Sequence, residues 1–261
     1  MRRSLLEIVF LSDKRKNLLL LLRDGSRRME EILEVLDVTR HALLPQIKIL
    51  SEHSLVIKEK DECRLSEIGE IIVEDMVPLI GTLNVLEKNY DYWTEHDLSS
   101  IPPHLLKRIR ELGHCEIIEP ELNDMFDLNK DIVAQALESQ FIWGATAFLH
   151  PSYPSLLLDL VKNDTDVSVI MTENALEKHK DDHGKELKMF LKSGNGKLYV
   201  YPNDMKLASI FIAEKFLMMC LFDVRGRYDP KDLVFRNPDA LQWGKELFGH
   251  YLLNSRKVMD L

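Results

Sequence analysis

The sequence predicts a multi-domain α+β protein, and three features of its apolar pattern support this. Residues 1–75 combine helical apolar spacing with a short hairpin pattern, and residues 76–100 continue as an apolar linking helix that ends in turn-forming residues. Residues 101–261 alternate strand and helix patterns, which is typical of an α/β layer. We therefore expect an N-terminal winged helix-turn-helix, a linking helix and a C-terminal α/β domain.

Length and cysteine usage agree with a chain of about two domains. The 261 residues are 45% hydrophobic, and domains average about 150 residues. Three distant cysteines form no C-x-x-C pair, which favours a reducing compartment over a disulfide framework. The apolar runs near the N-terminus are too short to span a bilayer, and no signal peptide is visible. These features predict a cytoplasmic protein without a membrane partner.

The formal net charge of −9 is distributed unevenly along the chain. Residues 1–72 contain 13 Lys+Arg and 13 Asp+Glu, so the acidic excess lies wholly in the later part. This leaves room for a locally basic face near the N-terminus. An acidic C-terminal region would repel nucleic acid.

The first elements are helices. Residues 4–22 show helical apolar spacing, which the polar run at 12–17 interrupts. Residues 28–36 form a second amphipathic pattern, after which Asp37 and Thr39 mark a turn and a new N-cap. The third helix carries a buried stripe of Leu43, Ile47 and Leu50.

Pro45 is an irregularity within this third helix, because proline removes one backbone hydrogen bond and bends the axis. Either the helix starts late, near Leu43, or it is kinked where it meets DNA.

A hairpin follows the third helix. The segments "LVIKE" and "CRLSE" alternate like half-buried strands around a "KDE" turn, and two such strands must pack on the helices to be stable. This order is that of a winged helix-turn-helix, in which the third helix enters the major groove and the hairpin reaches an adjacent phosphate or minor groove. The residues expected to contact double-stranded DNA are Thr39, Arg40, His41, Gln46, Lys48, Lys58, Lys60 and Arg64. The alternative is a helical subdomain that binds another protein.

The later part of the chain predicts a series of strands and helices. Strands are expected at 115–118, 141–150, 166–172, 197–202, 206–214 and 215–223. Helices are expected at 129–140, 153–163, 174–192 and 237–258, the last of them capped by Asn237.

Several segments resemble known regulators. The stretch "LLPQIKILSEHSLVIKEKDECRLSEIGEII" is similar to the winged helix of archaeal regulators related to the ArsR type. The segments "IPPHLLKRIRELGHCEII", "KLASIFIAEKFLMMCLFDVRGRYDP" and "NPDALQWGKELFGHYL" resemble the C-terminal domain of methanogenesis-regulator (Fil-type) transcription factors of methanogenic archaea. The resemblance spans nearly the whole chain and implies a DNA-binding transcription regulator. It also implies a homodimer joined through the helix after the wing, with recognition helices about 34 Å apart.

The C-terminal layout is similar to one half of a phospholipase-D-like fold, which raises an enzyme alternative. That chemistry needs the pattern H-x-K-x-x-x-x-D. His183 and Lys185 supply its first part, but Phe190 stands where the aspartate is required. The sequence therefore predicts a catalytically degenerate domain with no catalytic residues and no cofactor.

His179 and His183 are spaced as in the zinc motif H-E-x-x-H, but Lys180 replaces its glutamate. The surrounding charge is typical of a solvated helix face, so no metal site is predicted.

A small-molecule effector is the remaining expectation for the C-terminal domain. Ligands of open α/β layers collect at the carboxyl ends of strands, which here include Leu149, Glu173 and Tyr201. The residues expected to bind an effector are His150, Tyr153, Thr172 and Asp204. The alternative is that these polar groups only cap the helices that follow.

Overall fold

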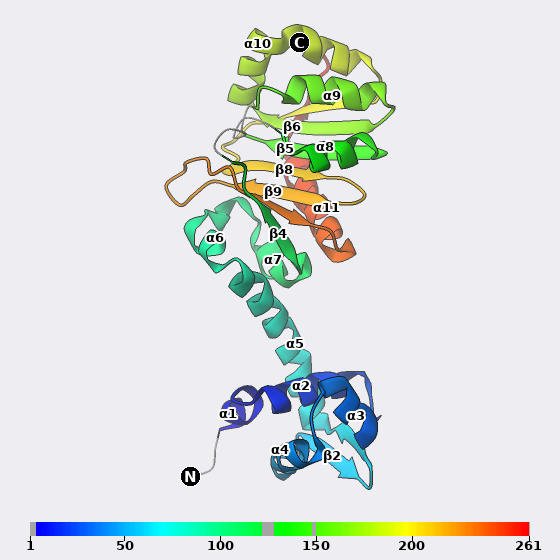
Figure 1. Ribbon diagram of the computed structural model, residues 1–261. Helices are drawn as coiled ribbons and strands as arrows, with labels where there is room; N and C mark the ends of the chain where they lie inside the picture. The colour runs from blue at the N-terminus through cyan, green and yellow to red at the C-terminus, as the bar shows by residue number, and fades with distance from the viewer. Residues whose placement is uncertain (1–3, 122–127, 148–149, 261) are drawn as a thin grey trace. The chain divides into compact units, whose positions relative to one another are not determined.

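The computed structural model describes residues 4–121, 128–147 and 150–260 (Figure 1). The chain divides into two compact units, Met1–Ile80 and Gly81–Leu261. The division falls inside a long helix, α5 (Glu67–Lys88), whereas the sequence placed the domain boundary at residue 75. Each unit has its own apolar core and is described by itself.

The first unit is helical with a small sheet. Its elements before α5 are α1 (Leu5–Phe10), α2 (Asp13–Leu21), a 3-10 turn (Leu22–Asp24), β1 (Arg27–Arg28), α3 (Met29–Leu36), α4 (Arg40–Glu52), β2 (Val56–Glu59) and β3 (Glu62–Leu65). The polar run at 12–17 separates α1 from α2 because the Ser12 side chain caps α2 by accepting the Arg15 amide hydrogen. Asp37 ends α3 with a left-handed backbone, φ 48°.

The hairpin of β2 and β3, predicted as a wing and called the wing below, belongs to a three-stranded sheet. The sheet order is β1-β3-β2, with Arg27 opposite Cys63 and Arg28 opposite Glu62. The sequence did not predict β1, because a two-residue strand next to a helix shows no alternation.

Helix α4 begins earlier than Pro45 would suggest. The helix runs continuously from Arg40 to Glu52, so the predicted alternative of a late start near Leu43 is wrong. The Thr39 hydroxyl accepts the Ala42 amide hydrogen at 3.3 Å and fixes the start. Pro45 has no amide hydrogen to donate to the His41 carbonyl, but it lies on the exposed side, where water can satisfy that carbonyl.

The core of the first unit joins its helices to its wing. It includes Leu18 and Leu19 of α2, Ile32 of α3, Leu43, Ile47 and Leu50 of α4, and Cys63 of β3. The predicted stripe of α4 is therefore confirmed as buried.

The second unit is built around one large sheet. Its helices are α6 (Tyr90–Glu95), α7 (Pro103–Leu106), α8 (Lys130–Leu137), α9 (Tyr153–Lys162), α10 (Glu173–Lys192) and α11 (Pro238–Leu253), with 3-10 turns at Leu98–Ser100 and Ile109–Leu112. Its strands are β4 (Cys115–Ile118), β5 (Phe141–Thr146), β6 (Asp166–Thr172), β7 (Gly196–Tyr201), β8 (Leu207–Ile212), β9 (Leu217–Leu221), β10 (Asp232–Phe235) and β11 (Arg256–Lys257).

The sheet is mixed. The strand order is β11-β7-β6-β5-β8-β9-β10-β4, and the pairs β5–β6 and β6–β7 are parallel while the others are antiparallel. The crossovers α9 and α10 connect the parallel strands, as the strand-helix alternation predicted. Strands β10 and β11 were not predicted, and residues 148 and 149 of the predicted strand 141–150, including Leu149, lie outside the described residues.

Alternating side chains of the sheet serve two cores. Along β6, Val167, Val169 and Met171 join the cluster covered by α8, α9 and α10, whereas Ile170 joins the cluster that contains Trp243 of α11 (Figure 1). This period of two explains why "SVIMT" reads as a continuous apolar run: both faces of the strand are covered.

Candidate nucleic-acid interface and ligand cavity

The exposed side of α4 carries cationic, polar and apolar residues. Those exposed are Arg40, His41, Leu44, Pro45, Lys48 and Glu52. Leu44 is 37% exposed, so this face also carries one large apolar side chain. This face can offer both charge and apolar contact to a partner.

Two of the residues expected to contact DNA have local structural roles. Thr39 caps α4, as described above. Gln46 is half-buried, and its side-chain oxygen accepts a hydrogen bond from the buried Arg15 guanidinium at 2.9 Å. These contacts account for both residues without a partner molecule.

Arg40 connects α4 with the wing. Its Nη2 lies 2.8 Å from Oδ1 of Asp61, which stands in the β2–β3 turn, and both side chains are about half exposed. The contact places the start of α4 beside the tip of the wing. Since exposed ion pairs contribute about 0–1 kcal/mol, a phosphate oxygen can replace the Asp61 carboxylate at little cost.

The predicted wing cations are exposed. Lys58, Lys60 and Arg64 all face solvent, and Arg64 lies 3.6 Å from the Glu59 carboxylate. Strand β1 adds Arg28, which is exposed and which the sequence analysis missed. The sequence feature that could have revealed Arg28 is the arginine pair directly after Gly25-Ser26, but the periodicity of residues 28–36 predicts a helix that begins at Arg28.

Acidic side chains are interleaved with these cations. Besides the pairs of Arg40 and Arg64, Lys48 of α4 lies 3.8 Å from Glu52. The positive charges of Arg40, Lys48 and Arg64 are therefore each partly compensated by a neighbouring carboxylate. Binding to a polyanion would exchange these internal pairs for phosphate contacts.

The second unit contains a cavity of about 480 Å³. Its apolar part is lined by α8, α9 and strands of the sheet, and it includes Ile132, Ala136, Ile142, Leu157, Leu160 and Met171. Its polar part is lined by Thr146, His150, Tyr153, Ser209, Tyr228 and Asp232. This volume and lining suit a small amphipathic molecule.

The four residues predicted to bind an effector divide between two cavities. His150 and Tyr153 line the cavity above, whereas Thr172 and Asp204 line a second cavity of about 600 Å³ near the ends of β6 and β7. The Thr172 hydroxyl caps α10 through the Ala175 amide at 3.3 Å, and Asp204 accepts the Lys206 amide hydrogen at 3.3 Å. Thr172 therefore has the helix-capping role that the sequence left as the alternative, whereas Asp204 holds a turn before β8.

His150 and Tyr153 form an aromatic wall of the first cavity. Their rings lie 5.2 Å apart, and the Tyr153 ring contacts Phe211 at 5.3 Å. Nδ1 of the buried His150 accepts the Ser152 amide hydrogen at 3.2 Å. Burial, followed by the charge of Asp232, raises the pKa of Tyr153, so that its phenol stays protonated at neutral pH.

Asp232 is the residue of this cavity that sequence reasoning missed. It opens β10, and burial raises the pKa of its carboxyl to about 7. Within the described residues, no hydrogen bond or ion pair reaches this carboxyl group. The available signal was an acidic residue at the head of the apolar run "LVF".

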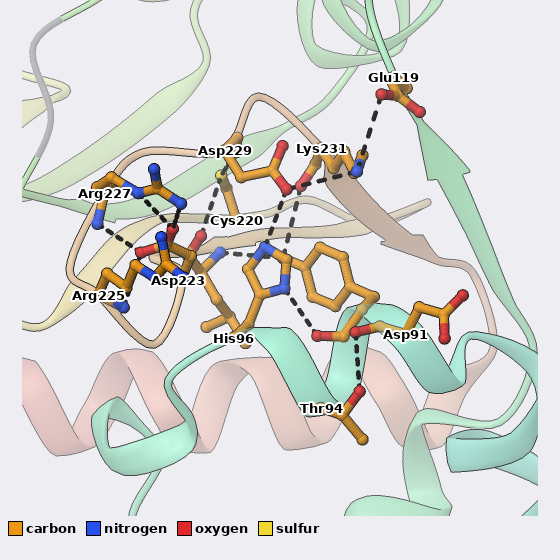
Figure 2. Close-up of polar contacts among 12 residues, drawn as sticks. Asp91, Thr94, His96, Glu119, Cys220, Asp223, Arg225, Arg227, Asp229 and Lys231 are labelled. Atoms are coloured by element: carbon orange, nitrogen blue, oxygen red, sulfur yellow. Dashed lines mark hydrogen bonds and ion pairs between the residues drawn. The ribbon is translucent and has the colours of Figure 1, made fainter.

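The segment that supplies Asp232 contacts different neighbours on its two sides. Tyr228, Pro230 and Asp232 line the cavity, whereas Asp229 and Lys231 face the cluster shown in Figure 2. There, Nε2 of His96 lies 3.4 Å from Asp229, and Lys231 lies 3.5 Å from Asp229. This alternation has a period of two, as in a strand.

His96 anchors this cluster from the segment after α6. Its Nδ1 lies 2.7 Å from the Tyr92 carbonyl oxygen, and its ring stacks on the Tyr92 ring with centroids 3.7 Å apart. The Tyr92 hydroxyl accepts the Leu221 amide hydrogen at 3.1 Å. Helix α6 and His96, the residue after it, thus contact the segment 228–232 on the side that does not line the cavity.

The histidine pair on α10 does not form a metal centre in the described structure. The rings of His179 and His183 lie 6.1 Å apart, and no group of three or more metal-binding side chains occurs among the described residues. His179 is buried without a hydrogen bond to either ring nitrogen, and burial lowers its pKa to about 4. It is therefore an uncharged core residue at neutral pH.

In the part of the chain that the structure describes, no helix is both long enough and apolar enough to cross a bilayer.

Comparison with known proteins gives two family matches. Residues 3–84 match the N-terminal domain, and residues 125–254 the middle domain, of the family described as Methanogenesis regulatory protein FilR1. The Methanogenesis regulatory protein FilR1 of Methanothrix harundinacea (strain 6Ac) is 27% identical over 256 residues, which cover 96% of this chain and 57% of the relative. The chain thus spans little more than half of that relative's length.

Two solved structures show weaker likeness. TrmBL2, an archaeal chromatin protein described as showing a novel mode of DNA binding, is 14% identical with a TM-score of 0.45, covering 97% of each chain. The phospholipase D family member Nuc from Salmonella typhimurium is 12% identical with a TM-score of 0.42, covering 56% of this chain and 99% of Nuc.

Proposed function

This chain carries the N-terminal and middle domains of the Methanogenesis regulatory protein FilR1 family, and we propose that it is a cytoplasmic transcription regulator whose winged helix binds double-stranded DNA. The regulatory role of the relative supports this proposal. The second unit is proposed to sense a small effector.

The contact of Arg40 with Asp61 carries the proposal for DNA binding. It joins the first turn of α4 to the tip of the wing at 2.8 Å, so that one partner can meet both elements at once. In a winged helix of the proposed ArsR-like type, α4 enters the major groove and the wing contacts the sugar-phosphate backbone. Arg40 would then read a base edge or bind a phosphate, and Lys58 and Lys60 would bind phosphates.

A homodimer belongs to the same proposal. Helix α5 exposes Ile68, Ile71 and Leu79, which are 50%, 65% and 48% exposed. A second copy that covered these residues would bury apolar surface and relate two α4 helices by a two-fold axis. An effector that favoured one arrangement of the dimer would alter affinity for the operator.

The strongest rival is a protein-interaction adaptor whose winged helix no longer binds DNA. The pairing of Arg40, Lys48 and Arg64 with carboxylates favours this rival, because it reduces the local positive potential. A degenerate phosphodiesterase-like enzyme has less support, since His183 and Lys185 lie on α10 and Phe190 is buried in the core.

The experiment that separates these functions is a genomic pull-down with the full chain, followed by mobility shifts on the recovered fragments at two salt concentrations. A regulator recovers a discrete set of fragments and binds them more weakly at the higher salt. Recovery of random fragments, or of none, would support the adaptor.

A further inference from the structure

We propose that the cavity lined by His150, Tyr153 and Asp232 binds an amphipathic organic cation, a primary or secondary amine with an apolar body, and that Asp232 is its counter-ion. This inference rests on the proposed role of the second unit as an effector sensor and adds the chemical class of the effector.

The apolar part of the cavity accommodates the body of the ligand. Ile132 and Ala136 of α8, Leu157 and Leu160 of α9, and Ile142 of β5 all line this space. All five belong to the buried core cluster on this side of the sheet. An alkyl or aryl group placed here leaves water at a gain of about 25 cal/mol per Å² of apolar area.

The charge of the lining disfavours anions. The cavity is lined by the carboxylates Glu119, Glu121, Asp131 and Asp232, and among the described residues Lys130 is its only lysine or arginine. Glu119 is 3.8 Å from Lys231, which compensates part of this charge. The two internal segments outside the description, 122–127 and 148–149, contain no lysine or arginine in their sequence. A cationic ligand is therefore complementary to this cavity, whereas a carboxylate or phosphate is repelled.

Asp232 supplies the specific contact. Its carboxyl group has no hydrogen-bond or ion-pair partner among the described residues, although it lines the cavity close enough to Tyr153 and Tyr228 to raise the pKa of both phenols. An isolated carboxylate in such surroundings is costly unless a cation pairs with it. An ammonium group satisfies it with both charge and N–H donors.

The neighbours of Asp232 complete a site for an ammonium group. The Thr146 hydroxyl, which also lines the cavity, donates to the Ala208 carbonyl at 3.0 Å and is thereby held in place. The aromatic rings of Tyr153 and Tyr228 line the same end, and aromatic faces attract cations within about 6 Å. A neutral alcohol could use the hydroxyl groups but would leave the Asp232 charge uncompensated.

The test uses the full chain and three probes of equal length: n-octylamine, 1-octanol and octanoate. Isothermal titration calorimetry at pH 8 should give a dissociation constant for octylamine at least about tenfold lower than for octanol, with octanoate weakest. Asp232→Asn should weaken octylamine binding by at least about tenfold and leave octanol binding within about twofold. Asp181→Asn, on the exposed side of α10, is the matched control and should change neither.

Acidity and cavity shape provide two further readouts. Because the pKa of Asp232 is about 7, octylamine should bind about tenfold more weakly at pH 6 than at pH 8 in the parent chain but not in Asp232→Asn. Ala136→Phe fills the apolar end and should abolish binding of both octylamine and octanol.

Equal affinity for amine and alcohol, or an octylamine affinity that Asp232→Asn leaves unchanged, would overturn the proposal. So would the absence of binding by every probe. These titrations contain no DNA, and the pull-down contains no amine. A failure of DNA binding with amine binding intact would therefore count against the regulator alone.

Discussion

Arg40 is the residue on which sequence-specific binding is expected to depend most. Replacing it with alanine removes its guanidinium from the junction of α4 and the wing. We expect Arg40→Ala to weaken binding to a recovered operator by about 1–3 kcal/mol, or roughly 5- to 150-fold, in fluorescence anisotropy titrations.

Arg23→Ala is the matched control, because Arg23 is also about half exposed and forms a similar surface pair with Asp24 at 3.0 Å. Equal losses in the two variants would show that Arg40 has no special role.

Asp232 makes stability depend on pH in an unusual direction. Its folded pKa of about 7 lies above the unfolded value of about 3.9, so the folded state holds this proton more tightly. The contribution of the Asp232 carboxyl to the free energy of unfolding is most favourable below pH 4, declines as the pH rises from 4 to 7, and is lost above pH 7. We expect Asp232→Asn to raise the thermal unfolding midpoint by several °C at pH 8 and by clearly less at pH 5.

Circular dichroism melts of Asp232→Asn and of the Asp181→Asn control at both pH values provide this measurement. A gain that is the same at pH 5 and pH 8 would mean that the Asp232 carboxyl is not held neutral by burial.

At the level of single residues, sequence reasoning located exposed cations well but could not assign cavity residues. Arg40, Lys48 and Lys58 could be identified because the buried stripe of α4 and the alternation of the wing fix which positions face outward. Gln46 contacts Arg15, 31 residues away, and no local pattern reports such a partner. Asp232 was missed for the same reason, since its surroundings come from distant strands and helices.

The wing is expected to contribute affinity without specificity. Lys58 lies on β2, Lys60 lies in the β2–β3 turn, and both are exposed. We expect Lys58→Ala and Lys60→Ala each to weaken binding to all DNA sequences alike, and to reduce the slope of log K against log salt by about 1.

Parallel titrations on a recovered operator and on a scrambled duplex distinguish this expectation from base recognition. A lysine variant that weakens only operator binding would contradict a phosphate-binding role for the wing.

Long elements could be predicted from their periodicity, whereas short ones could not. Helices α9 and α10 lie close to the expected ranges because 3.6-residue spacing repeats several times in each. Helix α11 ends at Leu253, so the predicted continuation of this helix to residue 258 is wrong. Strands β1 and β11 have two residues each, which is too few to show alternation. Strand β10 directly follows a polar loop, so its apolar residues were not recognised as a strand. The N-cap predicted at Thr39 is confirmed, and the late start near Leu43 is wrong, because capping by Thr39 outweighs the effect of the proline that follows.

The chain as a whole is expected to form a two-fold dimer through α5. Ile71, 65% exposed, is the most exposed apolar residue of that helix in the first unit, and a charge there should oppose burial against a second copy. We expect the parent chain to sediment as a dimer at micromolar concentration and Ile71→Glu to shift it towards the monomer. Val35→Glu, at a 60% exposed position on α3, is the control and should leave the dimer intact.

The four residues predicted to bind an effector divide between two cavities, and the sequence pattern did not predict this division. His150 and Thr172 each end a predicted strand, and the expectation was that both would lie at one ligand-binding edge of the sheet. The mixed sheet places the first cavity under α8 and α9, against one face of the sheet, and the second beyond β6 and β7. Strand order, which sequence periodicity does not encode, decides this separation.

The salt dependence of operator binding tests the central proposal most directly. Full-length protein would be titrated onto a recovered fragment at about 50 mM and about 200 mM salt. If the exposed cations of α4 and the wing neutralise about four phosphates, affinity should fall about 100-fold between these conditions. A salt-independent affinity, or no binding at the lower salt, would contradict a DNA-binding winged helix.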